Sequence, residues 1–370
     1  MAVDSCVMRF HPREMLAAKP AHVPRSLPLG LDQIARLLAA YPASAADAPA
    51  DRESMWTVFQ TERQQELHRV FMQGSPAAAL SILADPRGND LFHGFDGLCR
   101  TILARRNAAS ERDEVRAVVD ELFQLAAALG VGPRIFCPEI ALQQVAPPDP
   151  DALLDAIDAA LGQALTFPNP FAGEMGVATR RGIVSYRSPP AVYQAFRMRQ
   201  LAAGTDAPVV AEIGGGLGRT AFHAHRLGLR NYTLVDLPMT AIAQGYFLIG
   251  ALGPDAVSLH GEARGDGRLR IVPPSVFLAD ERRHDLVANI DSLTEMGRAT
   301  AEAYLRHIRR CARVFWSVNH ETNPYTVREL LGSAPDGVSD TRVPYWMRKG
   351  YVEETVLFGT GERAPKAWLA

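Results

Sequence analysis

The chain has 370 residues, of which 47% are hydrophobic and 22% are charged, and its formal net charge is −2. This length and hydrophobic content are sufficient for two domains with packed cores. The nearly neutral charge provides neither a basic face for nucleic acid nor a polybasic segment for an anionic membrane, so we expect neither as a partner.

Cysteine usage and the first residues indicate where the protein works. The four cysteines are far apart and form no CxxC pair: Cys6, Cys99, Cys137 and Cys311. A zinc site or a disulfide framework is therefore not expected, and scattered thiols are typical of cytoplasmic proteins. Residues 1–20 carry charges without an apolar run, unlike a signal peptide. No segment approaches the roughly 20 apolar residues that cross a bilayer. We predict a cytoplasmic protein.

Residues 1–165 are predicted to be helical. Apolar residues recur at helical spacing in segments 31–41, 55–72 and 114–129. Asp149 and Asp151 are suited to cap a further short helix that ends near Leu161. The apolar faces of these helices need a partner, which is either the rest of the chain or a second copy of it. We therefore expect a cap or a dimerisation region, with a homodimer as one candidate assembly and Trp56 in the core.

Residues 166–207 are predicted to form a glycine-rich linker or lid followed by a helix at 191–201. Residues 182–186 are suited to a short extended ribbon. A segment of this kind is able to close over a ligand. Tyr186 and Arg187 in the linker, and Tyr193 and Arg197 on the helix, are the candidate contacts to a substrate.

Residues 208–370 alternate between strand-like and helix-like segments. Strands are predicted at 209–213, 232–235, 285–290 and 314–318, and helices at 219–227, 239–252 and 299–312. This order predicts an α/β domain, a doubly wound and mostly parallel sheet joined by right-handed crossovers. The pattern at 257–273 leaves the secondary structure there open.

The motif EIGGGLGR, residues 212–219, follows the first strand and begins a helix. Glycine permits the tight turn and the close approach of backbone to a ligand that such a loop needs. The spacing of Gly214, Gly216 and Gly218 is GxGxG, whereas the dinucleotide motif is GxGxxG and position 219 is Arg. No GK[ST] follows the glycines either. Both differences disfavour a nicotinamide cofactor or a nucleoside triphosphate.

Two acidic residues narrow the class of ligand. Asp236 ends the second strand, roughly 20 residues after the glycines, where an acid accepts hydrogen bonds from ribose hydroxyls. Glu212 lies two positions before the first glycine, where a carboxylate attracts a cation and repels a pyrophosphate. The combination favours a positively charged nucleoside without phosphate, and S-adenosylmethionine has this chemistry.

The segment VVAEIGGGLGRTAFHAHRLGLRNYTLVDLPMTAIAQGYFL resembles the class I S-adenosylmethionine-dependent methyltransferases. More narrowly, it is similar to a bacterial sugar O-methyltransferase family, which has an EIGGGxGR loop, a VDLP segment and an acidic-Ser-Leu-x-Glu-Met stretch, matched here by residues 291–296. The resemblance covers residues 186–325. It implies a Rossmann-like fold, S-adenosylmethionine as methyl donor, and an oxygen acceptor on a small molecule such as a sugar or a natural-product intermediate.

The resemblance also implies roles for the residues of the glycine loop. Glu212, Gly214 and Gly216 would line the methionine end of the cofactor, and Gly218 would complete the loop before the helix.

For the rest of the cofactor, the resemblance implies contacts at the ends of two further strands. Asp236 would hold the ribose and Leu237 would pack against the adenine. Asn289 and Ile290 would lie near the methyl group to be transferred.

Methyl transfer to a hydroxyl is an in-line displacement that profits from a general base. Ligands bind at the carboxyl ends of strands in such sheets, so the base should follow a strand. His320 and Glu295 fit this place, and Asp291 is a third candidate. Each also has a structural interpretation: His320 and Asp291 as partners of loop backbone, and Glu295 as one half of a capping box with Ser292.

Several alternatives remain open at this point. In the first, the enzyme methylates a nitrogen or carbon atom of a secondary metabolite. In the second, the chain is a nicotinamide-dependent oxidoreductase. In the third, it is a non-catalytic binding protein. No spacing of His, Cys, Asp and Glu resembles a metal-binding motif, so we predict no metal.

Overall fold

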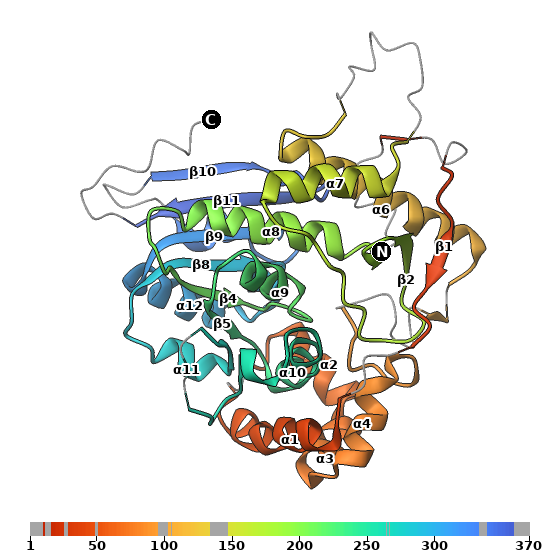
Figure 1. Ribbon diagram of the computed structural model, residues 1–370. Helices are drawn as coiled ribbons and strands as arrows, with labels where there is room; N and C mark the ends of the chain where they lie inside the picture. Colours follow the sequence, from red (N-terminus) through yellow and green to blue (C-terminus); the bar gives the residue numbers. More distant parts are fainter. Residues whose placement is uncertain are drawn as a thin grey trace.

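The computed structural model describes residues 10–11, 16–25, 29–48, 51–94, 103–104, 106–133, 147–263, 265, 267–332 and 339–358. Within this part of the chain, eight strands form one sheet in the order β10-β11-β9-β8-β4-β5-β7-β6 (Figure 1). Its centre is parallel and consists of β4 (Val209–Ile213), β5 (Asn231–Val235), β8 (His284–Ile290) and β9 (Ala312–His320). The predicted Rossmann-like, mostly parallel sheet is thereby confirmed.

The edges of the sheet include strands in the segment that the sequence pattern left open, 257–273, and a hairpin that was not predicted. On one side lie the short parallel strands β6 (Val257–Ser258) and β7 (Leu269–Val272). On the other side a hairpin of β10 (Ser339–Pro344) and β11 (Tyr351–Leu357) adds to the sheet, with β11 antiparallel to β9. The chain thus closes the sheet with a hairpin next to the last parallel strand.

Alternating residues of the central strands enter two separate hydrophobic clusters. On one face, Leu234 and Trp316 pack with the helices α8 (Ser188–Leu201), α9 (Arg219–Arg226) and α10 (Pro238–Leu252). On the other face, Ile213 and Phe315 pack with α11 (Pro274–Leu278), α12 (Arg298–Cys311) and α13 (Val327–Leu331). Helices therefore cover both faces of the sheet, and a strand period of two explains the separation.

The described part of residues 1–165 is mainly helical, and helices occupy the three segments that show helical spacing. Its helices are α1 (Leu31–Ala46), α2 (Met55–Arg63), α3 (Gln65–Gln73), α4 (Pro76–Ala84), α6 (Ala108–Ala128) and α7 (Pro150–Leu161), with a 3-10 turn at Pro86–Gly88. The expected single helix at 55–72 is two helices that meet at Gln64.

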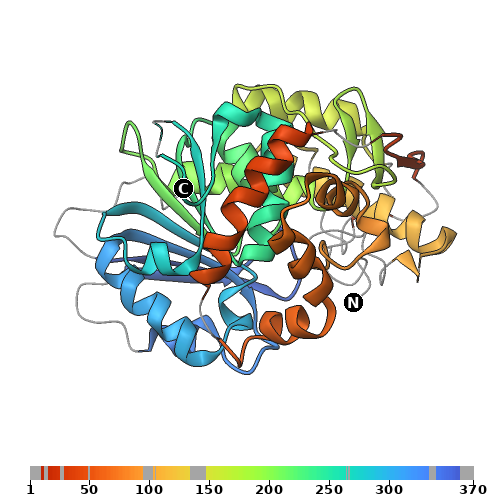
Figure 2. The same cartoon turned by 90° about the horizontal axis from the view of Figure 1, so that it is seen from below.

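These N-terminal helices share their core with the sheet domain. The hydrophobic cluster of the α8–α10 face extends into α1, α4, α6 and α7, and α1 lies against α10 (Figure 2). A small antiparallel sheet joins β1 (Pro20–His22), β2 (Met175–Thr179) and β3 (Gly182–Val184), where the extended ribbon was expected. None of the described helices has the length and apolar character to cross a membrane.

The connections of the sheet place its ligand crevice. From β4 the chain proceeds through α9 to β5 on one side, whereas β8 pairs with the other side of β4. Such a switch in strand order opens a crevice at the carboxyl ends of the strands. The glycine motif, Asp236, Asp291 and His320 all lie where β4, β5, β8 and β9 end, so the fold brings them to one edge.

Candidate active site

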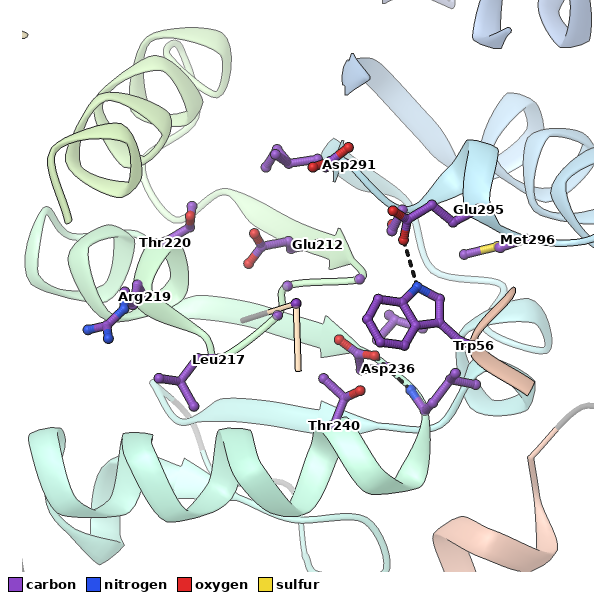
Figure 3. Close-up of a pocket in the computed structure, with 18 of the residues that line it drawn as sticks. Trp56, Glu212, Leu217, Arg219, Thr220, Asp236, Thr240, Asp291, Glu295 and Met296 are labelled. Carbon is purple, nitrogen blue, oxygen red and sulfur yellow. Dashed lines mark hydrogen bonds between the residues drawn. The ribbon is translucent and has the colours of Figure 1, made fainter. Parts of the chain in front are cut away.

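A cavity of about 470 Å³ opens at the carboxyl ends of the parallel strands. Figure 3 shows Glu212, Asp236, Asp291 and Glu295 around it, together with Trp56 from the N-terminal region. Most of the residues predicted from the sequence line this cavity: Glu212, Gly214, Gly216, Asp236, Leu237, Ile290, Asp291, Glu295, His320, Tyr186 and Arg187. The cofactor-side and catalytic candidates therefore share one space.

Two predicted cofactor contacts lie behind the wall instead. Gly218 has φ +90° and caps the start of α9. Asn289 is fully buried, and its amide Nδ2 donates to the carbonyl of Ile213 at 3.2 Å. Asn289 also accepts from Asn319 Nδ2 at 2.8 Å. These residues shape the loop and hold adjacent strands together without lining the cavity.

Two predicted substrate contacts, Tyr193 and Arg197, point elsewhere. Arg197 Nε donates to Glu353 Oε1 at 2.9 Å, and the Tyr193 ring lies 5.8 Å from that of Tyr345. Residues four apart share one helix face, and on α8 this face turns toward the C-terminal hairpin. Tyr193 and Arg197 therefore do not line the cavity, whereas Ala191 and Gln194 of the same helix do.

The glycine loop is packed closely against the turn that follows β8. Gly214 has φ +73° and Gly216 has φ +56°, a region that favours glycine. A Cβ on Gly214 would lie 2.1 Å from Ser292 Oγ. Ser292 Oγ in turn donates to the carbonyl of Ile213 at 2.9 Å. Close packing as well as backbone conformation therefore requires glycine at position 214.

Asp236 is held in place by its own turn and by α10. Its Oδ1 accepts from the backbone N–H of Leu237 at 2.8 Å, and its Oδ2 accepts from Gln244 Nε2 at 2.7 Å. The same Gln244 nitrogen donates to the carbonyl of Gly216 at 2.9 Å. Burial raises the pKa of Asp236 to about 7. Gln244 thus couples the acid to the glycine loop.

Glu212 is the second buried acid beside the glycine loop, with 2% of its surface exposed. The Tyr232 hydroxyl donates to its Oε2 at 2.7 Å. Burial nevertheless raises the pKa of Glu212 to about 7, and the nearby Asp236 adds to the increase. A cationic ligand beside this carboxyl would compensate for the water it has lost.

The three catalytic candidates meet on the opposite side of the cavity. One ligand atom from each of Asp291, Glu295 and His320 lies within 4.8 Å of the others, and this is the one such group found in the described residues. Asp291 has φ +55°, and its Oδ2 accepts from Arg348 Nη1 at 3.0 Å and from the Tyr351 hydroxyl at 2.9 Å. Carboxylate oxygens and an imidazole nitrogen are also donors that a divalent ion uses. In this site the guanidinium of Arg348 already balances the negative charge of Asp291.

Glu295 contacts the N-terminal region. The Trp56 indole Nε1 donates to Glu295 Oε2 at 2.6 Å, and burial raises the pKa of Glu295 to about 7. The capping-box interpretation of Glu295 is wrong, because Ser292 makes no side-chain cap and bonds to Ile213 instead. The assignment of Trp56 to the core is also wrong, since it lines the cavity.

Sequence reasoning missed several residues of the site, among them Trp56, Glu121, Arg348 and Tyr351, which line the cavity, and Gln244, which holds Asp236. Of these, only Gln244 lies near a motif, eight positions after Asp236 on the next helix. The others come from α2, α6 and the C-terminal hairpin, and no local pattern marks them.

No family model and no curated protein matches the sequence. Among solved structures, the chain is similar to magnesium protoporphyrin IX methyltransferase from Synechocystis PCC 6803 with bound SAM, at 15% identity and TM-score 0.34, over 46% of this chain and 83% of that one. Cofactor-bound Rv0187 from MTB gives 18% identity and TM-score 0.35, over 49% and 83%.

A third similar structure is a decarboxylase by name. Precorrin 8W decarboxylase from Methanobacterium thermoautotrophicum gives 13% identity and TM-score 0.32, over 44% of this chain and 88% of that one. Each of these similarities extends over less than half of this chain. They do not assign it a reaction, which is inferred below from the site.

Proposed function

We propose that the protein is a class I S-adenosylmethionine-dependent methyltransferase that methylates a hydroxyl group of a small molecule, such as a sugar or a natural-product intermediate. The observation that carries the proposal is the pair of buried acids, Glu212 and Asp236, on either side of a close-packed glycine loop. Asp236 is suited to the ribose hydroxyls. Glu212 is suited to the positively charged end of the nucleoside.

The charges beside the glycine loop disfavour a pyrophosphate-containing ligand. A diphosphate on the loop would face Glu212 and Asp236, both of them buried. Arg219, the first residue of α9, is bound to Glu174 at 2.6 Å. Like charges at short distance in a low dielectric are strongly repulsive. A sulfonium nucleoside instead gains from the same two acids.

The acceptor side supplies a base. S-adenosylmethionine, when bound, provides an activated methyl group on sulfur. With Oε2 held by Trp56, Glu295 keeps Oε1 for the acceptor, and among the described residues no hydrogen bond to that atom is found. A carboxylate whose pKa lies near 7 is well matched to accept a hydroxyl proton at neutral pH. We therefore assign the general base to Glu295.

His320 has the geometry of a positioning residue. The backbone N–H of Thr322 donates to His320 Nδ1 at 3.3 Å, so the neutral ring carries its proton on Nε2. That Nε2 lies 3.7 Å from Asp291 Oδ1. This distance is too long for a hydrogen bond, and Asp291 Oδ1 has no hydrogen-bond partner among the described residues, whereas Oδ2 accepts from Arg348. His320 and Asp291 together orient the acceptor and fix the charge beside Glu295.

The proposal is tested by ligand binding and by methyl transfer. A ligand at 100 times its Kd stabilises the folded state by about 2.7 kcal/mol, so S-adenosylhomocysteine should raise the melting temperature and NAD should not. Transfer of labelled methyl groups to polyhydroxylated acceptors should follow. Stabilisation by NAD together with none by S-adenosylhomocysteine would favour the oxidoreductase alternative and refute the proposal.

A further inference from the structure

Glu121 on α6 lies in the wall of the cavity with 2% of its surface exposed. Its Oε2 is buried, and among the described residues it has no hydrogen-bond partner. On the same helix, Glu114 pairs with Arg106 at 2.9 Å and Asp120 Oδ1 pairs with His11 at 2.7 Å. Asp120 Oδ2 is also without a hydrogen-bond partner among the described residues, but Asp120 does not line the cavity, whereas Glu121 does. Buried polar atoms without partners are rare in native proteins, so an unpaired carboxyl in a cavity wall points to a ligand.

The charges around Glu121 indicate the kind of ligand. Burial raises its pKa well above the ordinary value, and the guanidiniums of Arg348 and Arg187 oppose the increase. The same two arginines also lower the pKa of Glu295. A second acid, Asp291, lies next to Glu295. The acceptor space is therefore bounded by three acids and two guanidiniums, so both signs of charge are present.

This arrangement selects against charged acceptors. An ammonium group placed at Glu121 would meet the field of Arg187 and Arg348, and a carboxylate or phosphate would meet Glu295 and Asp291. A neutral molecule with several hydroxyl groups avoids both costs. Its hydroxyls are able to donate to a carboxyl oxygen and to accept from a guanidinium at the same time.

We propose that Glu121 binds a second hydroxyl group of a neutral, polyhydroxylated ring and so determines which other hydroxyl faces Glu295. This inference rests on the proposed function, because it needs a small-molecule acceptor in this cavity. Glu121 acts as a specificity residue: it selects the acceptor and the position methylated, and takes no part in the proton transfer.

The experiment compares E121M and E121Q with E114M, which removes a paired acid from the same helix. Melting temperatures are measured without ligand. Binding of S-adenosylhomocysteine is measured by calorimetry. Binding of neutral methyl glycosides, of glucosamine and of glucuronate to the S-adenosylhomocysteine-loaded protein is then measured by saturation-transfer NMR.

We expect E121M to melt no lower than the wild type, because replacing an unpaired buried polar group by an apolar one removes its desolvation cost. E114M should melt lower, since it leaves Arg106 without its partner. E121M should bind neutral glycosides at least tenfold more weakly, E121Q should retain part of the affinity, and both should bind S-adenosylhomocysteine like the wild type. In the wild type, neutral glycosides should bind better than glucosamine or glucuronate.

Other results overturn the inference. A melting temperature of E121M as low as that of E114M shows a structural role. Equal glycoside binding by E121M and wild type, preference for a charged sugar, or no binding of any neutral glycoside each refute the assignment, while intact S-adenosylhomocysteine binding leaves the proposed function standing. Failure of the wild type to bind S-adenosylhomocysteine refutes the proposed function itself.

Discussion

The indole of Trp56 donates a 2.6 Å hydrogen bond to the carboxylate of Glu295, and so joins α2 of the N-terminal region to the turn that follows β8. Two further bonds reinforce this junction: Gly297 N–H donates to Asp51 Oδ2 at 3.0 Å, and Ser54 Oγ donates to the carbonyl of Glu295 at 3.4 Å. The N-terminal region therefore completes the cavity that the sheet begins.

Replacement of Trp56 by Phe should change the pH dependence of turnover. The indole hydrogen bond lowers the pKa of Glu295 against the effect of burial, so W56F should raise that pKa above about 7. A hydrogen bond to a charged group contributes about 1.5 kcal/mol, which corresponds to roughly one pH unit. The acidic limb of the kcat profile should move upward by that amount.

W346F is the matched control, because Trp346 Nε1 donates to the backbone carbonyl of Gln124 and does not line the cavity. Its kcat profile should stay at the wild-type position. An unmoved profile in W56F would show that the indole does not tune the base.

Separate replacement of Glu295 and His320 should identify the base. E295Q keeps the shape of the side chain and removes the proton acceptor, so kcat should fall by about 10²- to 10⁴-fold while S-adenosylhomocysteine affinity stays unchanged. H320N should lose less, because we place His320 as a positioning residue beside Asp291, at 3.7 Å, and not as the proton acceptor. A larger loss in H320N assigns the base to His320. Near-normal turnover in both variants favours an amine or carbon acceptor, which makes less demand on a base.

The cofactor side of the site could be predicted because its information is local. The apolar strand, the glycine spacing and Asp236 at the end of the next strand lie within 28 positions of one another, from Val209 to Asp236. Strand order alone then brings Glu212 and Asp236 to one edge. The same locality explains why the strands at the centre of the sheet were predicted to within two residues at most of their ends.

The acceptor side could be predicted only in part. Asp291, Glu295 and His320 follow strands and were found by that rule, whereas Trp56, Glu121 and Arg348 reach the cavity through tertiary packing. A tryptophan at helical spacing has the same pattern whether it faces the core or a cavity. For the same reason the sequence could not show that Tyr193 and Arg197 lie outside the cavity lining, because no sequence signal says which face of α8 the hairpin covers.

Replacement of Gly214 by Ala should abolish cofactor binding. A Cβ there would lie 2.1 Å from Ser292 Oγ and 2.3 Å from Ser292 Cβ, at φ +73°. The loop must move, so we expect a lower melting temperature and no detectable binding of S-adenosylhomocysteine by calorimetry.

G162A separates the clash from the backbone conformation. Gly162 has φ +69°, and a Cβ on it would have no neighbouring atom within 4 Å. Its substitution should therefore cost only about 1 kcal/mol and leave binding intact. Wild-type affinity in G214A would show that the loop is not closely packed around the cofactor.

The buried Glu212 should make the unliganded protein less stable as the pH rises. Its folded-state pKa of about 7 lies above the ordinary value of 4.5, so between these values the folded protein binds more protons than the unfolded one. Stability should therefore fall as the pH increases through this window, by about 3 kcal/mol for a fully buried group.

E212Q should remove that pH-dependent loss, because its amide oxygen still accepts from Tyr232 and carries no charge. Denaturant unfolding should show E212Q gaining stability relative to the wild type at pH 8 compared with pH 5, whereas E302Q, an exposed acid on α12, should show no such difference. S-adenosylmethionine, being cationic, should lose more affinity than S-adenosylhomocysteine in E212Q. An equal loss for both would mean that Glu212 faces the α-ammonium group, which both ligands carry, and not the sulfonium, which only S-adenosylmethionine carries.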